Sequence, residues 1–129
     1  MSWDRAVVAA ALVDVLGPAT GVTVHAIPPE VLNPMCVVVS RPQTVAFSTV
    51  APGIDEATLP LVVVGGVETE DRVEALKGAC RSAVLADPTL GGVTPNLNCY
   101  PSEERNWRNV TGAGGIQLLL VELILTVQM

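Results

Sequence analysis

The sequence predicts an α+β fold in which two helices pack on one mostly antiparallel, mixed sheet. The first observation is a helical segment rich in alanine and valine that begins within the first few residues. The second is an amphipathic helical segment in the middle of the chain, and the third is that runs of β-branched residues lie between and after the two helices. At 129 residues, the chain is expected to form one α+β domain over residues 1–129.

The first helix is expected from about Trp3 to Leu16, with Ser2 as its N-cap and Gly17-Pro18 as its end. Its only polar residues are Asp4, Arg5 and Asp14. A helix that is apolar on nearly every side cannot be covered by a single sheet. We therefore expect either that the fold buries it on two sides or that a neighbouring subunit covers it.

Four strands are expected between the two helices. They lie at Gly21–Ile27, Met35–Ser40, around Val45–Ser48 and at Leu59–Val67. Prolines interrupt the chain after the first strand, and Arg41-Pro42 closes the second. The fourth has a β-branched run that predicts burial on both faces.

The second helix is expected from about Glu70 to Leu85, with Thr69 as N-cap. A buried stripe at helical spacing consists of Val73, Leu76, Cys80 and Val84. An opposite, solvated stripe consists of Glu70, Glu74, Lys77 and Arg81. Acids precede bases along this stripe, which suits the helix dipole and allows pairing between successive turns.

The stretch PLVVVGGVETEDRVEAL resembles a phosphate-binding arrangement, because a strand, two glycines and a helix follow one another. Gly65-Gly66 fits neither the dinucleotide fingerprint nor the P-loop. Glu68, Glu70 and Asp71 would also repel an anion at this helix start. The stretch therefore predicts a turn and a well-capped helix, without a nucleotide site.

After a turn at Asp87–Val93, three strands are expected, around Val93–Tyr100, at Trp107–Val110 and at Ile116–Val127. The last is apolar on one face at Leu119, Val121, Leu123, Leu125 and Val127. Its other face carries Ile116, Leu118, Leu120, Glu122, Ile124 and Thr126. Such a two-sided strand is expected to be central in the sheet or paired across a subunit boundary.

No catalytic, cofactor-binding or metal-ligating residue is predicted. His25 is the only histidine and has no nucleophile signature beside it, and the acids at positions 30, 55, 56, 103 and 104 are expected in solvated loops. Cys36, Cys80 and Cys99 are expected to be buried, reduced thiols in a cytoplasmic setting. The net charge of −6 disfavours a surface that holds nucleic acid or anionic lipid, and no membrane segment is expected.

Arg105 and Arg108 flank Trp107, a combination typical of contact hot spots between proteins. The alternative is that Trp107 packs on its own sheet with the arginines over its edge. Together with Arg41 and Phe47, these three residues are our candidates for partner contact. Only 16% of the residues are charged, which suggests that a partner covers some of the apolar surface.

The order of elements resembles a known family. The second half, with LKGACRSAVLADPTLGGVTPNL and LLLVELILTVQ, is similar to the tail-terminator (tail-completion) proteins of long-tailed bacteriophages, relatives of the phage lambda U protein. In the first half, VTVHAIPPEVLNPMCVVVSRP resembles versions from phages of actinobacteria. The resemblance covers most of the chain and lies in the pattern and order of the elements.

This resemblance implies a virion protein that forms a hexameric ring at the head-proximal end of the tail tube. Such a ring stops tube polymerisation and joins the tail to the head–tail connector (stopper) protein, while DNA passes through its centre. Loops corresponding to Arg41–Thr58 and Ser102–Gly115 would meet the tail-tube protein or the connector. The alternatives are another connector or tail-tube subunit, or a small cytoplasmic ligand-binding or enzymatic domain that uses His25, Cys36 or Cys99.

Overall fold

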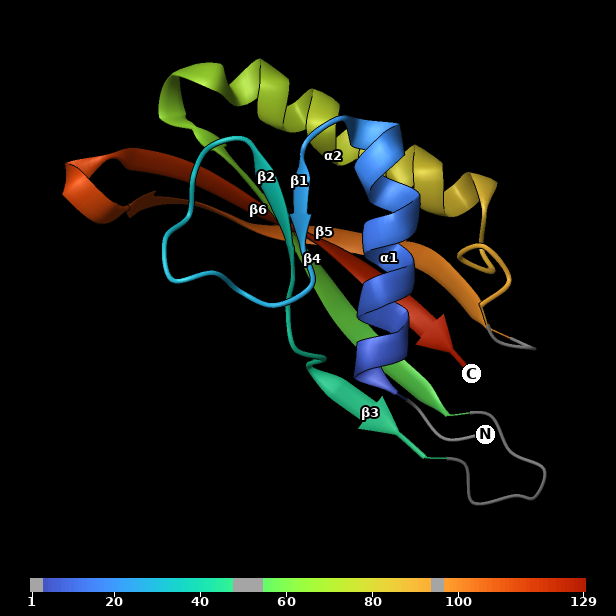
Figure 1. Cartoon of the computed structure of the whole chain (residues 1–129). Coiled ribbons are helices and arrows are strands. Elements are labelled where there is room, and N and C mark those ends of the chain that lie inside the picture. The colour runs from blue at the N-terminus through green and yellow to red at the C-terminus, as the bar shows by residue number, and fades with distance from the viewer. Residues whose placement is uncertain (1–3, 48–54, 94–96) are drawn as a thin grey trace.

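The computed structural model describes residues 4–47, 55–93 and 97–129. Helices and strands follow in the order α1 (Arg5–Thr20), β1 (Thr23–His25), β2 (Cys36–Val39), β3 (Thr44–Ala46), β4 (Glu56–Gly66), α2 (Glu70–Ala86), β5 (Asn98–Thr111) and β6 (Gln117–Gln128). Short 3-10 turns at Val67–Thr69 and Ala113–Gly115 precede α2 and β6. Within the described residues, two helices lie on a mixed sheet of six strands, so the predicted fold class is confirmed (Figure 1).

The sheet has the strand order β1-β2-β4-β6-β5, and β3 pairs with β4 beside β2. Among the strands of the described residues, β1 and β2 run parallel, and the other pairs are antiparallel. The centre is the long pairing of β4 with β6, from Glu56 opposite Gln128 to Gly66 opposite Leu118. β6 is therefore a central strand of its own sheet, which explains its two apolar faces without a partner subunit.

Both helices cover the same face of the sheet, and α1 also packs against α2 (Figure 1). The main core lies between these layers and includes the predicted face of β6, Leu119 to Val127 in alternation. The apolar side of α1 is thus buried twice, by the sheet and by α2. Of the two expectations for this helix, the first holds within a single chain.

The predicted ends of α1 are wrong. Asp4 is the N-cap, with its carboxylate accepting from the N–H groups of Ala6 and Val7 at 3.0 and 3.3 Å. Ser2 and Trp3 lie outside the described residues. The helix continues through Gly17-Pro18, because a glycine before proline has no Cβ to clash with the proline ring. It ends at Gly21, whose φ of +70° is the left-handed conformation that glycine adopts readily.

The predicted buried stripe of α2 is confirmed at all four positions. Its first turns lie so close to β4 that a Cβ on Gly65 would overlap Cγ2 of Val73. Gly65 therefore allows a close approach of helix and strand, and it lies at the end of β4 instead of in a turn. Lys77 departs from the predicted solvated stripe, because it is only 9% exposed.

The two strands predicted before the C-terminal strand are one strand, β5. Two irregularities interrupt its pairing with β6, one at Ser102 and one at Asn106 and Trp107, where two residues of β5 face one of β6. The expected loop Ser102–Gly115 is therefore mostly strand, and Glu103 and Glu104 lie in β5 and not in a loop. The expected loop Arg41–Thr58 contains β3 and the start of β4, and residues 48–54 of it are outside the described part.

The other predicted strands are confirmed in order, with ends that differ by a few residues. The predicted end of the third strand, Ser48, and residues 94–96 of the strand expected around Val93–Tyr100 lie outside the described residues. The face of the sheet opposite the helices holds a second, smaller apolar cluster made by Cys36, Val38, Val64, Leu118 and Leu120. Leu32, from the proline-rich segment between β1 and β2, packs on this cluster, so that segment crosses the face that carries no helix.

Candidate interaction surface

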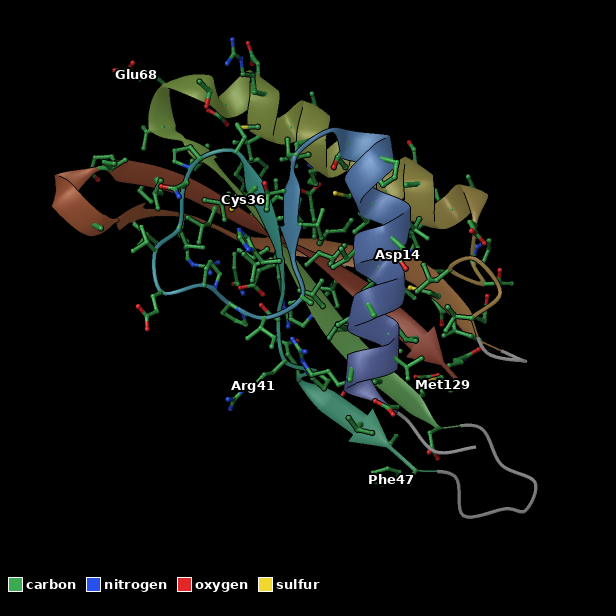
Figure 2. All side chains as sticks on the ribbon, viewed as in Figure 1. Asp14, Cys36, Arg41, Phe47, Glu68 and Met129 are labelled. Atoms are coloured by element: carbon green, nitrogen blue, oxygen red, sulfur yellow. The ribbon has the colours of Figure 1, made fainter. Side chains whose placement is uncertain are left out.

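The five candidate contact residues do not form one surface. Arg41 and Phe47 lie on either side of β3, and both side chains point away from the sheet (Figure 2). Arg105, Trp107 and Arg108 lie on β5, which is the opposite edge of the sheet because β4 and β6 lie between β3 and β5. Phe47 is 68% exposed, the largest exposure of any described aromatic side chain.

The irregularity in β5 also separates Trp107 from the two arginines. Alternation along β6 places Glu122 on the same face as Leu118 and Leu120, away from the helices. Arg105 and Arg108 both contact Glu122 on that face, whereas Trp107 lies beneath α2 against Lys77. Trp107 and the two arginines therefore lie on opposite faces of the sheet, and their contact with a partner stays a prediction.

Trp107 belongs to a polar cluster that joins α2 to β5. The Lys77 Nζ lies 5.3 Å from the centre of the indole ring, and Trp107 Nε1 donates to Glu104 Oε2 at 3.1 Å. Lys77 Nζ also donates to Glu104 Oε2 at 2.7 Å and to Glu74 Oε2 at 2.8 Å. The structure is closer to the alternative, in which Trp107 packs on its own sheet. The cation over its ring is Lys77, however, and not one of the arginines.

The pKa shifts in this cluster favour the charged forms of Lys77 and Glu104. Burial lowers the pKa of Lys77, but the hydrogen bonds and charges of Glu104 and Glu74 outweigh it, so the pKa lies above its ordinary value. The hydrogen bond from Lys77 is the largest cause that lowers the pKa of Glu104. The Lys77 side chain is only 11% exposed, and the two carboxylates bound to its ammonium compensate the charge at this covered position.

Glu122 holds the two arginines across the face that carries no helix. Arg108 Nη1 lies 3.0 Å from Glu122 Oε2, and Arg105 Nε lies 3.9 Å from Glu122 Oε1. Arg105 also pairs with Glu103 at 3.1 Å, and the Glu122 side chain is only 13% exposed. The aliphatic parts of long side chains held in this way can cover apolar strand residues below them. This explains how a single glutamate is accommodated in an otherwise apolar central strand.

A hollow lies at the corner where β4 passes into α2, and we call it the corner hollow. It has a volume of about 600 Å³ and is lined mainly by apolar atoms. Its lining is Pro34, Met35, Gly66, Val67, Glu68, Thr69, Arg72 and Gln117. The Thr69 hydroxyl closes the 3-10 turn below the hollow. It accepts a hydrogen bond from the Gly66 N–H at 3.1 Å and donates one to the Gly66 carbonyl at 2.9 Å. Glu68, Glu70 and Asp71 are all exposed here, as expected for the helix start.

The remaining chemically interesting side chains lie apart from one another. His25 is half-buried on β1, paired with Val38 of β2. All three cysteines are buried and free of disulfides, as expected. Burial raises the pKa of Cys80 and of Cys99 to about 12 each, and that of Cys36 also lies above its ordinary value. These thiols are therefore protonated at neutral pH.

Among residues 4–47, 55–93 and 97–129, no group of three or more His, Cys, Asp or Glu is arranged to hold a metal ion. In the same part of the chain, no helix is long and apolar enough to cross a bilayer. No protein-family model and no curated protein matches this sequence. The described residues form a closed core, and exposed apolar and aromatic side chains are distributed around its outside.

Proposed function

We propose that this chain is the subunit of a bacteriophage tail terminator, a ring in the virion that caps the tail tube and joins it to the head–tail connector. The proposal starts from the resemblance in the order of elements, which implies a small α+β subunit of this kind. The observation that carries it is the distribution of exposed apolar side chains. They lie at separate places around one packed core: Ile27, Val31, Phe47, Val67, Leu85, Val93, Tyr100, Trp107 and Ile116.

A ring subunit needs several distinct contact surfaces, because it meets two neighbours in the ring, the tube on one side and the connector on the other. A single patch would suit one partner, whereas exposed apolar groups at both sheet edges and at both ends of α2 suit several. Phe47 and Arg41, at the β3 edge, are our candidates for contact with the tube or the connector.

The proposed mechanism is steric. One side of the ring resembles a tube subunit and binds the last tube ring, and the other side offers no matching surface to a further tube subunit. Only the connector fits that second side, so elongation ends and joining begins. DNA passes through the ring without specific binding, for which the net charge of −6 is suitable because phosphates are not attracted.

The test is removal of the chain from a phage that encodes it, followed by electron microscopy of the lysate. The expected result is tails of uncontrolled length that are not attached to filled heads. Supplying the purified wild-type chain to such a lysate should restore joining, and a Phe47→Asp chain should restore it less well. Tails of normal length attached to heads in the absence of the chain would contradict the proposal.

The alternatives predict different products from the purified chain. A tail-tube subunit would polymerise alone into long cylinders, whereas a terminator would give closed rings or monomers. A ligand-binding or enzymatic domain would be stabilised by its ligand, so a thermal-shift screen with nucleotides and metabolites would raise the melting temperature by several degrees.

A further inference from the structure

The two ends of α2 differ in shape and charge. At its start lies the corner hollow, where Val67 is 39% exposed and Glu68, Glu70 and Asp71 face solvent beside one arginine, Arg72 (Figure 2 labels Glu68). At its other end the last turn presents Leu85, 48% exposed, and the segment after the next turn presents Val93, 49% exposed. The 17 residues of α2 separate these ends by roughly 25 Å, at a rise of about 1.5 Å per residue.

Arg81 supplies the charge at the second end. It lies four residues before Leu85 and therefore on the same side of the helix. Glu103 and Glu104 line a small recess with it, but Glu103 pairs with Arg105, and Glu104 pairs with Lys77. Asp87 accepts hydrogen bonds from Thr89 and Gly91, as a cap of the following turn. In the described residues, Arg81 has no ion-pair partner of its own.

We propose that copies of this chain join head to tail through the two ends of α2. Leu85 and Val93 of one copy would enter the corner hollow of the next, against Met35 and Val67, and Arg81 of the first would pair with Glu68 of the second. This contact deepens the proposed function. That the row of copies closes into a ring rests on the proposed function itself. It assigns the contact between neighbours in the ring to residues other than Arg41 and Phe47.

The charges select this polar arrangement over a symmetric one. A symmetric pairing of two corner hollows would bring Glu68, Glu70 and Asp71 of one copy against the same residues of the other, with one arginine on each side. It would also leave each hollow facing a hollow. The head-to-tail pairing gives each hollow an apolar side chain and each arginine a carboxylate. Contacts of this unequal kind form rings when the rotation between copies closes.

The first test is charge exchange, measured as oligomeric state by sedimentation velocity over a concentration series of the full chain. Arg81→Glu alone and Glu68→Arg alone should each weaken association at least tenfold. The double variant carries both changes in one chain, restores an opposite-charge pair at every contact and should associate nearly as the wild type does. The matched control is Arg41→Glu, an exposed arginine outside the proposed contact, which should leave association unchanged.

The second test uses one damaged end per chain. Leu85→Asp and Val67→Asp chains should be monomeric alone, and both should fold, because the two side chains are already 48% and 39% exposed. When mixed, they should form a one-to-one dimer that grows no further, because each contributes its intact end. Ile27→Asp, at a residue 72% exposed elsewhere, is the control.

Wild-type chain that stays monomeric throughout the concentration series would overturn the inference. So would Leu85→Asp and Val67→Asp mixtures that remain monomeric, or single charge variants that associate normally. The outcome is separable from that of the proposed function. If the chain associates head to tail but its removal leaves phage tails normal, this contact is retained and the terminator role is refuted. If removal gives tails of uncontrolled length but the purified chain does not associate through α2, the terminator role is retained and this contact is refuted.

Discussion

Replacing Trp107 with alanine decides between two roles for this side chain, a support between α2 and β5 or an anchor for a partner. In the structure, the indole lies beneath Lys77 and donates to Glu104, and the residue is 37% exposed. We expect the Trp107→Ala chain to fold with lower stability and to associate as the wild type does. If Trp107 were an anchor for a partner, the Trp107→Ala chain would keep its stability and lose association.

The size of the loss follows from the covered area. A tryptophan with about a third of its surface exposed has on the order of 100–150 Å² of its ring covered, and at about 25 cal/mol per Å² this corresponds to at most about 4 kcal/mol, which a compact unfolded chain reduces. The cation–π contact with Lys77 adds roughly 0.5–1 kcal/mol. We therefore expect the free energy of unfolding to fall by about 2–3 kcal/mol and the melting temperature by about 10 °C.

Urea denaturation followed by circular dichroism measures this loss, and sedimentation velocity on the same samples measures association. Trp107→Phe is the matched control, because it keeps the ring under Lys77 and loses only the N–H bond to Glu104. Its stability should fall by less than about 1.5 kcal/mol. A Trp107→Ala chain with unchanged stability and lost association would refute the reasoning and return Trp107 to the partner surface.

Three further predictions concern the core and the polar cluster. Leu123→Asp places an unpaired charge between the sheet and the helices and should abolish the cooperative unfolding transition. Gly65→Ala should cost about 1–3 kcal/mol in denaturant unfolding, because its Cβ overlaps Val73. Since Lys77 holds the pKa of Glu104 below its ordinary value of 4.5, their pairing stabilises the fold above that pH and is lost as the pH falls through the lowered pKa. Glu104→Gln should therefore flatten the acid side of the stability profile.

The two core changes each have a matched control. Leu123→Met preserves the volume and should cost less than about 1.5 kcal/mol. Gly66→Ala adds a Cβ whose nearest neighbour is the Thr69 hydroxyl at 3.4 Å, so it should be tolerated better than the change at Gly65. If Gly65→Ala proved as stable as Gly66→Ala, the close approach of α2 to β4 would be refuted. If Glu104→Gln kept the acid slope of the wild type, the pairing with Lys77 would not govern that slope.

Patterns that depend on periodicity could be predicted from the sequence. The buried stripe of α2 and the two faces of β6 follow from spacings of 3.6 and 2 residues, which survive in the fold because each face meets a single layer. The end of α1 could not be predicted from Gly17-Pro18, because the glycine before the proline has no Cβ and so removes one of the clashes by which a proline disfavours helix. The merging of two expected strands into β5 depended on irregular pairing that only the partner strand reveals.

The candidate contact residues were harder to predict for the same reason. In a regular strand, Arg105 and Trp107 would share a face, and Arg108 would lie on the other; the extra residue in β5 instead places both arginines on one face and Trp107 on the other. Lys77 could have been recognised as special only by knowing that Glu104 lies opposite it, 27 residues away in the chain.

Glu122 is the residue that connects these observations. A glutamate in the central strand would ordinarily destabilise the sheet, because its charge loses water on burial. Here the irregularity in β5 brings two arginines to it, so the same feature that moves Trp107 under α2 also neutralises Glu122. The charged side chains of β5 are thereby all paired within the chain, on both faces of the sheet. Among the described residues, Glu68 and Arg81, toward the two ends of α2, have no ion-pair partner within the chain, and these are the charges that the proposed contact between copies would use.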